Sequence, residues 1–192
     1  MDGDRTAARA LRLLPGGRQV TARLDRLLVA AAPEDAPPFQ VAGRAFEEDT
    51  FLVMSADPRV AEPEIHPLRL MRELANVRPA APGGVVVRPG APMRFLAIVH
   101  DLNQDPTWRE EWVAGALQAL LGAVEARRLA ALALPLLGTR HGRLASERFG
   151  ALLAAALRSR PPRHLRRLWL VVPPGAQRQA IADLATAWGQ QS

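Results

Sequence analysis

Two glycines and two arginines lie close together in the segment Pro-Leu-Leu-Gly-Thr-Arg-His-Gly-Arg, which spans residues 135–143. Glycine lets the backbone approach a ligand closely, and the N–H groups at the start of a helix bind anions. Arginine adds bidentate contacts to a phosphate. The alternative is a tight strand-to-helix turn in which the glycines only supply positive φ angles. The predicted ligand-binding residues of this loop are Gly138, Thr139, Arg140, His141, Gly142 and Arg143.

Histidines and acids at predicted strand ends are the other candidates for chemistry. His100 and Asp101 follow an apolar run and form a candidate general acid–base pair that faces a ligand, unless His100 only hydrogen-bonds to the backbone. His141 lies in the phosphate loop, where its ring can meet a phosphate or a ribose hydroxyl. His66 and His164 are predicted at a helix start and in a solvated turn. Because no two histidines have the spacing of metal ligands on a helix, we expect no bound metal. We also expect no cofactor.

The composition excludes several classes of chemistry. The chain has no cysteine, no tyrosine and no lysine, so all 25 basic residues are arginine. Disulfides, thiolate catalysis, cysteine-ligated zinc, Schiff bases and the P-loop lysine are therefore excluded. The formal net charge of +6 favours phosphate-bearing ligands.

A length of 192 residues suits one core of ordinary size. No apolar run is long enough to cross a membrane, and the first residues mix acids with arginines. We expect a cytoplasmic protein without a membrane partner.

Strand patterns alternate with helix patterns from residue 39 to residue 188, which is typical of a mostly parallel sheet. This predicts an α/β fold, a three-layer α/β/α domain with a mixed, mostly parallel central sheet, in which ligands bind at the carboxyl ends of the strands. The predicted strands are 39–46, 50–56, 85–87, 95–99, 130–139 and 165–174, and the predicted helices are 66–76, 108–129, 144–159 and 176–188.

The helix at 108–129 has Asp105 or Thr107 as a plausible N-terminal cap and acids in its first turn. Trp108 and Trp112 are four residues apart, so a helix here would place both on one face. Packing onto the sheet is the usual role of such residues, and closing over an adenine is the alternative.

Residues 1–38 differ from the rest and are predicted to form an N-terminal extension to a domain at 39–192. A helix pattern covers 5–14. The segment 20–31 fits either an amphipathic helix or a strand followed by a turn, and the proline-rich segment 33–38 predicts a surface connection. The extension is therefore either helical or a layer added to the main domain.

The segment 135–142 resembles the Pro-Leu-Leu-Gly-Thr-Gly-x-Gly motif of the macro domain family, with Arg140 in place of the third glycine. Phe-Leu-Ala-Ile-Val-His at 95–100 is similar to the family's strand that ends in Val-Ile-His, and Gly-Gly-Val-Val-Val at 83–87 to the strand before it. The order of elements from 39 to 188 is also similar. The resemblance implies an α/β domain that binds ADP-ribose, a related nucleotide or an ADP-ribosylated protein.

Other segments depart from the family pattern. The family's Gly-Asp-Ile-Thr corresponds to 43–46, where Arg44 replaces the acid that holds the adenine amino group. Its Val-Asn-Ala-Ala-Asn becomes 53–57, with Asp57 in place of the Asn that contacts the distal ribose in hydrolases. The glycine-rich loop that wraps the diphosphate has no equivalent in 58–67. These departures imply binding without efficient turnover, with Asp57 among the ligand-binding candidates.

Two alternatives stay open. One is a hydrolase that acts on an ADP-ribosyl or nucleotide phosphate bond, with Asp57 or Asp101 as catalytic candidates that position water. The other is a scaffold without a pocket, which binds nucleic acid or a partner protein through the arginine-rich segment 158–167.

Overall fold

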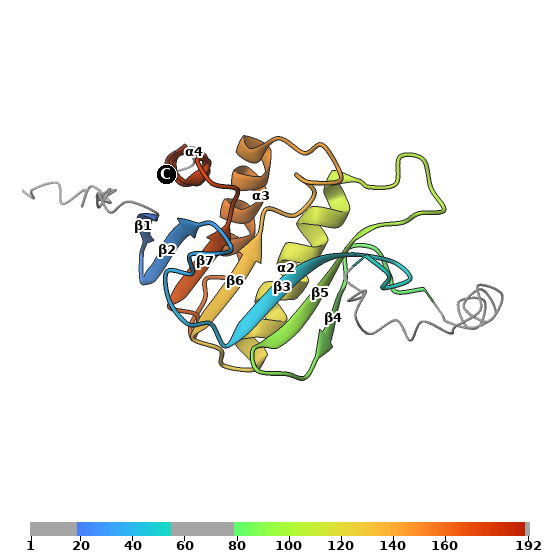
Figure 1. The fold of residues 1–192 in the computed structure, drawn as a ribbon, viewed down its shortest axis with the longest axis horizontal. Coiled ribbons are helices and arrows are strands. Elements are labelled where there is room, and N and C mark those ends of the chain that lie inside the picture. The colour runs from blue at the N-terminus through green and yellow to red at the C-terminus, as the bar shows by residue number, and fades with distance from the viewer. Residues whose placement is uncertain (1–18, 55–78, 191–192) are drawn as a thin grey trace, which may run out of the picture.

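The computed structural model describes residues 19–54 and 79–190, and in this part of the chain seven strands form one sheet (Figure 1). In sheet order, β2, β7, β6, β3 and β5 run parallel, and the edge strands β1 and β4 pair antiparallel with β2 and β5. The strands are β1 (Val20–Leu24), β2 (Leu27–Ala32), β3 (Gly43–Asp49), β4 (Val85–Arg88), β5 (Met93–His100), β6 (Ala131–Pro135) and β7 (Arg167–Val171).

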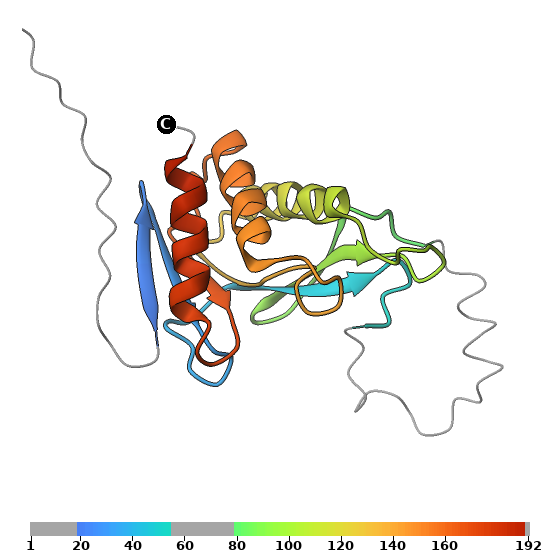
Figure 2. The same cartoon turned by 90° about the horizontal axis from the view of Figure 1, so that it is seen from above.

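Helices α2 (Glu110–Ala126), α3 (Ser146–Ser159) and α4 (Gln177–Gly189) pack side by side on one face of this sheet (Figure 2). The predicted α/β fold class with a mixed, mostly parallel sheet is confirmed. The helices predicted at 5–14 and 66–76 lie outside the described residues. Among the described residues, no helix has both the length and the apolarity needed to cross a membrane.

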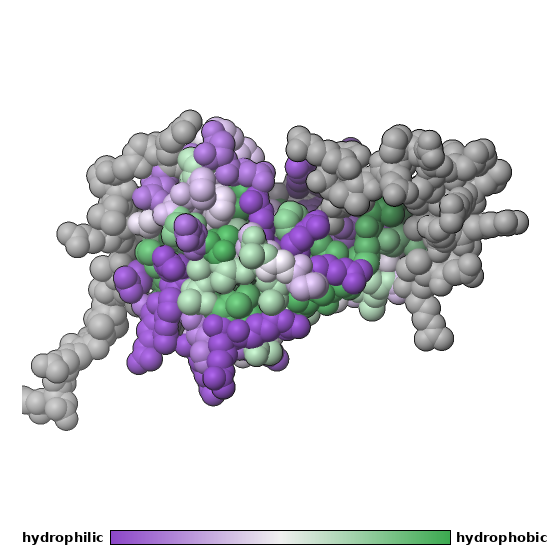
Figure 3. Space-filling view, turned by 60° about the horizontal axis from the view of Figure 1, so that its bottom comes forward, coloured by the Kyte–Doolittle hydropathy of each residue, from purple (hydrophilic) through white to green (hydrophobic). Residues whose placement is uncertain are grey.

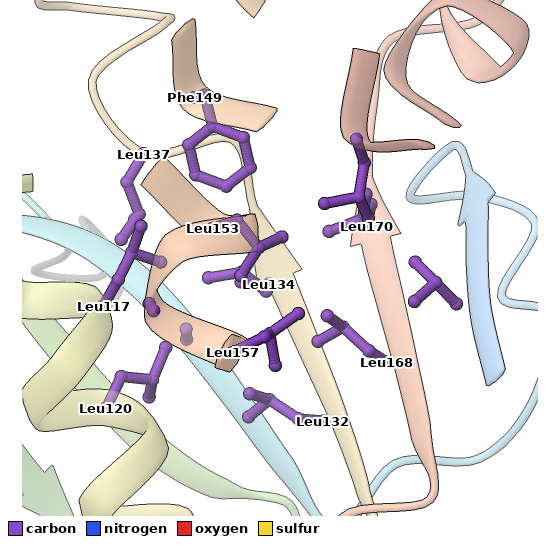
Figure 4. Close-up of a cluster of buried hydrophobic side chains, with 14 of the residues drawn as sticks. Leu117, Leu120, Leu132, Leu134, Leu137, Phe149, Leu153, Leu157, Leu168 and Leu170 are labelled. Atoms are coloured by element: carbon purple, nitrogen blue, oxygen red, sulfur yellow. The ribbon is translucent and has the colours of Figure 1, made fainter. Parts of the chain in front are cut away.

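The core lies between the sheet and these helices and is made mainly of leucine and alanine. Residues 95–99 of β5 and 131–134 of β6 are all buried, so these two apolar runs form strands covered on both faces. Side chains of α2 and α3 meet those of β6 and β7 in this core (Figure 4). The labelled residues are Leu117, Leu120, Leu132, Leu134, Leu137, Phe149, Leu153, Leu157, Leu168 and Leu170.

The segment 20–32 forms an antiparallel hairpin, not a helix. Ala22 and Leu24 are buried while Arg23 between them is exposed, which is the two-residue period of a strand. Asp25 has a φ of 53° in the tight turn between the strands. Because β2 pairs with β7, this hairpin extends the same sheet as the rest of the chain.

Helix α2 begins later than predicted. Its N-terminal cap is Arg109, which makes no side-chain cap hydrogen bond, so the predicted caps Asp105 and Thr107 are wrong. Trp108 precedes the helix and bridges to His100 of β5, so it does not share a helix face with Trp112. The acids predicted in the first turn are Glu110 and Glu111.

Glu125 holds the connection from α3 to β7 against the end of α2. Its carboxylate accepts hydrogen bonds from the backbone N–H groups of Arg163, His164 and Leu165 at 3.0 to 3.1 Å, and it lies 3.0 Å from Nδ1 of His164. Burial raises the pKa of this carboxyl, but the hydrogen bonds from Leu165, His164 and Arg163 together outweigh burial. The pKa therefore lies below its ordinary value of 4.5.

We expect Glu125→Gln to lower the free energy of unfolding by about 1 to 2 kcal/mol at neutral pH, because hydrogen bonds to a charged group are lost. The stabilisation by the charged carboxylate is present above the pKa of the unfolded chain and disappears as the pH falls through the lower, folded pKa. Thermal unfolding of both proteins at neutral pH and below pH 4 checks this. A difference in stability that persists unchanged in acid would contradict it.

Candidate functional site

Strands β6 and β3 separate toward their carboxyl ends. They pair only at Gly43 with Leu132 and Arg44 with Ala133. The chain after β3 continues toward β4 at one edge of the sheet, whereas the chain after β6 leads through α3 to β7 on the other side. This is a topological switch point, the place where open α/β sheets bind ligands.

The loop from 136 to 145 follows β6 at this point and leads into α3. Gly138 has a φ of 77°, which a glycine adopts without strain. The Thr139 hydroxyl donates to the carbonyl of Leu136 at 2.7 Å, and the Leu144 N–H donates to the carbonyl of Gly138 at 3.0 Å. These bonds fold the loop back on itself.

Gly142 is needed for a different reason from Gly138. It is buried, and a Cβ at this position would lie 2.7 Å from the carbonyl oxygen of Gly138 and 2.7 Å from Cδ2 of Trp108. Its φ is not in the positive range. Of the two loop glycines, only Gly138 supplies a positive φ, and Gly142 allows close packing against Trp108.

The tip of the loop presents donors for an anion. The side chains of Arg140, His141 and Arg143 are exposed. Within residues 19–54 and 79–190, the backbone N–H groups of residues 140–143 meet no protein acceptor. The loop therefore carries backbone N–H groups that have no acceptor among the described residues, and two exposed guanidinium groups, just before the start of α3.

Glu47 links the three strands of the site, although no motif in the sequence singles it out. One carboxylate oxygen lies 2.5 Å from Nε2 of His100, and the other accepts the N–H of Gly138 at 2.9 Å. The side chains of Glu47 and His100 are 11% and 3% exposed. The imidazole of His100 therefore pairs with Glu47, whereas the sequence suggested either Asp101 or the backbone. The feature of the sequence that could have indicated this role is the run of three consecutive acids, Glu47, Glu48 and Asp49.

The carboxylates of Glu48 and Asp49 accept hydrogen bonds from the backbone of the segment that follows β3. Glu48 accepts the N–H of Met54 at 2.6 Å. Asp49 accepts the N–H of Phe51 at 2.6 Å and those of Val53 and Met54 at 3.1 and 3.0 Å. The strand predicted at 50–56 is therefore wrong over 50–54, because these carboxylates hold the segment in turns.

Asp101 organises its own loop. It accepts the N–H of Asn103 at 3.1 Å and the side-chain amide of Gln104 at 2.7 Å. His141 comes close to His100, with ring centroids 6.1 Å apart and the rings edge to face. The structure thus brings His100 and His141 together beside the loop of residues 136–145, while the carboxylate of Asp101 serves a local turn.

Other predicted positions fall elsewhere. Residues 43–46 lie inside β3 and not before a strand, and Arg44 pairs with Glu34. The connection between β2 and β3 contains the acids Glu34 and Asp35. Asp57, His66 and the segment 58–67 lie outside the described residues. His164 is exposed as predicted and contacts Glu125.

The described residues contain no metal-binding cluster, because no three His, Asp or Glu side chains among them are placed to hold an ion. The site is instead a loop of free amides and arginines beside a buried pair, Glu47 and His100.

No family model and no curated protein matches the sequence. Solved structures do match the fold. The macrodomain of Oceanobacillus iheyensis, solved with ADP, has a TM-score of 0.64 and 14% identity, over 88% of this chain and 95% of that one. The macro domain of ganglioside induced differentiation associated protein 2 has a TM-score of 0.58 and 9% identity, over 85% of both chains.

A third match is the macrodomain of DarG from Thermus aquaticus, with a TM-score of 0.54 and 18% identity, over 76% of this chain and 98% of that one. These identities are too low to carry a function across, but the agreement in fold extends over most of each chain. The resemblance first visible in residues 135–142 therefore holds in three dimensions, and this chain has the macrodomain fold.

Proposed function

We propose that the carboxyl edge of the sheet binds ADP-ribose or a related nucleotide, with a phosphate seated on the loop of residues 138–143. The observation that carries this proposal is the set of backbone N–H groups at 140–143, which meet no acceptor among the described residues and lie beside Arg140 and Arg143. The macrodomain fold supports it, since the Oceanobacillus iheyensis structure was solved with ADP at similar topology.

The start of the connection after β3 contributes little to a diphosphate clamp. The N–H groups of Phe51, Val53 and Met54 already donate to the carboxylates of Glu48 and Asp49. They are therefore not available to a ligand. In this proposal the loop of residues 138–143 holds the phosphate, and the affinity for diphosphates is modest.

Efficient hydrolysis is not part of the proposal. Positioning a water needs a carboxylate with a free oxygen close to the ligand. In the described part of the site, the carboxylates of Glu47, Glu48, Asp49 and Asp101 each accept hydrogen bonds from the protein itself. These contacts support a binding module, which recognises a free nucleotide or an ADP-ribosylated protein.

Arg140→Ala tests the phosphate seat. We expect the affinity for ADP-ribose, measured by calorimetry, to fall roughly tenfold or more, because a charge-assisted hydrogen bond is lost. Arg178→Ala removes an arginine of α4 that is also exposed, and it serves as the control. Equal affinities in the two variants would place the phosphate elsewhere.

We expect release of ADP-ribose from a modified protein to be slow or absent. If a residual rate is measurable, Asp57→Ala should change it little, because a negative charge at that position would repel a nearby phosphate. Single-turnover release from an ADP-ribosylated substrate protein is the measurement. Rapid release that Asp57→Ala eliminates would instead support a hydrolase.

A further inference from the structure

Arginines line up across three strands at the opposite edge of the sheet, where the parallel strands begin. In the strand register, Arg44 of β3 lies directly opposite Arg94 of β5, and Arg94 lies opposite Arg88 of β4. Neighbouring strands are about 4.8 Å apart. These three residues, called the arginine row below, therefore project from the same face of the sheet, and α2, α3 and α4 cover the other face (Figure 2).

Like charges placed directly opposite one another destabilise a sheet. The structure offsets part of this cost with an ion pair from Arg44 to Glu34. The ring of Phe46 also lies under two guanidinium groups, with Arg44 at 5.7 Å and Arg94 at 4.8 Å from its centroid. Arg44 keeps 25% of its side chain exposed, and Arg88 is exposed. The row therefore still presents positive charge to solvent.

The basic character continues along this edge. Arg167 begins β7, is exposed, and stacks on the ring of Phe39 at 5.2 Å. Leu28 lies opposite both Arg167 and Arg23, which places Arg23 on the same face at β1. Figure 3, which brings the lower edge of Figure 1 forward, shows hydrophilic residues bordering a hydrophobic area. The loops at this edge add Arg26, Arg127, Arg128, Arg163 and Arg166.

Few acids balance these arginines. At this edge of the described chain the acids are Asp25, Glu34, Asp35 and Glu125. Glu34 pairs with Arg44, and Glu125 accepts the N–H groups of residues 163–165. The acids of the candidate nucleotide site, Glu47 to Asp49, lie at the other end of β3. The edge of the sheet where the parallel strands begin, called the basic edge below, is thus rich in arginine and poor in acids.

The dimensions and chemistry of the basic edge select one kind of partner. From β4 to β1 the arginines span six spacings between β-strands, or roughly 29 Å. This distance is too long for one nucleotide and fits a nucleic-acid chain of several nucleotides. Half-buried phenylalanine rings beside guanidinium groups offer stacking surfaces for unpaired bases, whereas a duplex keeps its bases stacked internally. We propose that the arginine row, with Arg167, Phe39 and Phe46, binds single-stranded nucleic acid.

This site is separate from the one proposed for nucleotides. It also differs from the segment 158–167 suggested by the sequence, because Arg158 donates to the carbonyls of Ala187 and Trp188 at the end of α4. Of that segment, Arg163, Arg166 and Arg167 lie at the basic edge.

Fluorescence anisotropy with a labelled 15-nucleotide oligothymidylate tests the proposal. With three phosphate contacts, the dissociation constant should rise roughly 20-fold between 50 and 200 mM salt. Arg88→Ala should weaken binding and reduce the logarithmic salt slope by about 0.7. Arg178→Ala, which removes the same charge from α4, should leave both unchanged. If a thermal melt shows that Arg88→Ala is unfolded, Arg167→Ala replaces it, since Arg167 is also exposed.

Three further measurements decide what is bound and where. Phe46→Leu should weaken oligothymidylate binding roughly fivefold or more and leave heparin binding unchanged, because heparin has no bases to stack. Equal affinity for a duplex of the same length would overturn single-strand recognition. Displacement of the oligonucleotide by saturating ADP-ribose, or equal effects of Arg88→Ala and Arg178→Ala, would overturn the basic edge as its site.

Discussion

Glu47→Ala is expected to lower the free energy of unfolding by about 4 kcal/mol. The substitution leaves two buried groups without partners, the imidazole of His100 and the N–H of Gly138, and each such loss costs roughly 1 to 3 kcal/mol. It should also weaken nucleotide binding, because Gly138 begins the loop proposed to hold the phosphate. Chemical denaturation and calorimetry with ADP-ribose measure the two effects.

Glu47→Gln is the matched control. The amide oxygen can still accept from Gly138 and the amide nitrogen can still meet the imidazole, so a smaller loss of stability is expected. A Glu47→Ala protein as stable as the wild type would show that this pair does not hold β3, β5 and β6 together.

Gly142→Val is expected to abolish nucleotide binding and to lower stability by about 1 to 3 kcal/mol. The added side chain cannot fit, since its Cβ alone would lie 2.7 Å from both the Gly138 carbonyl and the Trp108 indole. The loop must therefore move away from Trp108, and its N–H groups lose their arrangement. Calorimetry with ADP-ribose and a thermal melt of the same sample are the measurements.

Gly189→Val is the control for this substitution. Gly189 ends α4, and no atom lies within 4 Å of an added Cβ there. This variant should bind nucleotide as the wild type does. If Gly142→Val folds and binds ADP-ribose with unchanged affinity, the loop is not the phosphate seat.

The sequence was most informative where burial alone decides the structure. The runs at 95–99 and 131–135 contain almost only apolar residues, and strands covered on both faces need such runs. The segment 20–31 stayed ambiguous because its apolar residues fit both helical and strand periods. The turn at Asp25 and the pairing of β2 with β7 resolve it.

Hydrogen bonds between side chains and distant backbone were not predictable from periodicity. Glu47 is 53 residues from His100 and 91 residues from Gly138, so no local pattern joins them. The apolar residues after Asp49 follow a strand pattern, yet the carboxylates of Glu48 and Asp49 bind their N–H groups and make turns. The sequence predicted too early a start for α2, because no side chain caps the helix where it actually begins.

Calorimetric titration of the full chain with ADP-ribose, NAD, AMP and polymeric ADP-ribose tests most directly whether the carboxyl edge is a nucleotide site. A nucleotide site there should give a saturable heat with ADP-ribose that is lost in Gly142→Val and kept in Gly189→Val. No heat from any of the four ligands at millimolar concentration, or a heat that Gly142→Val leaves unchanged, would contradict it.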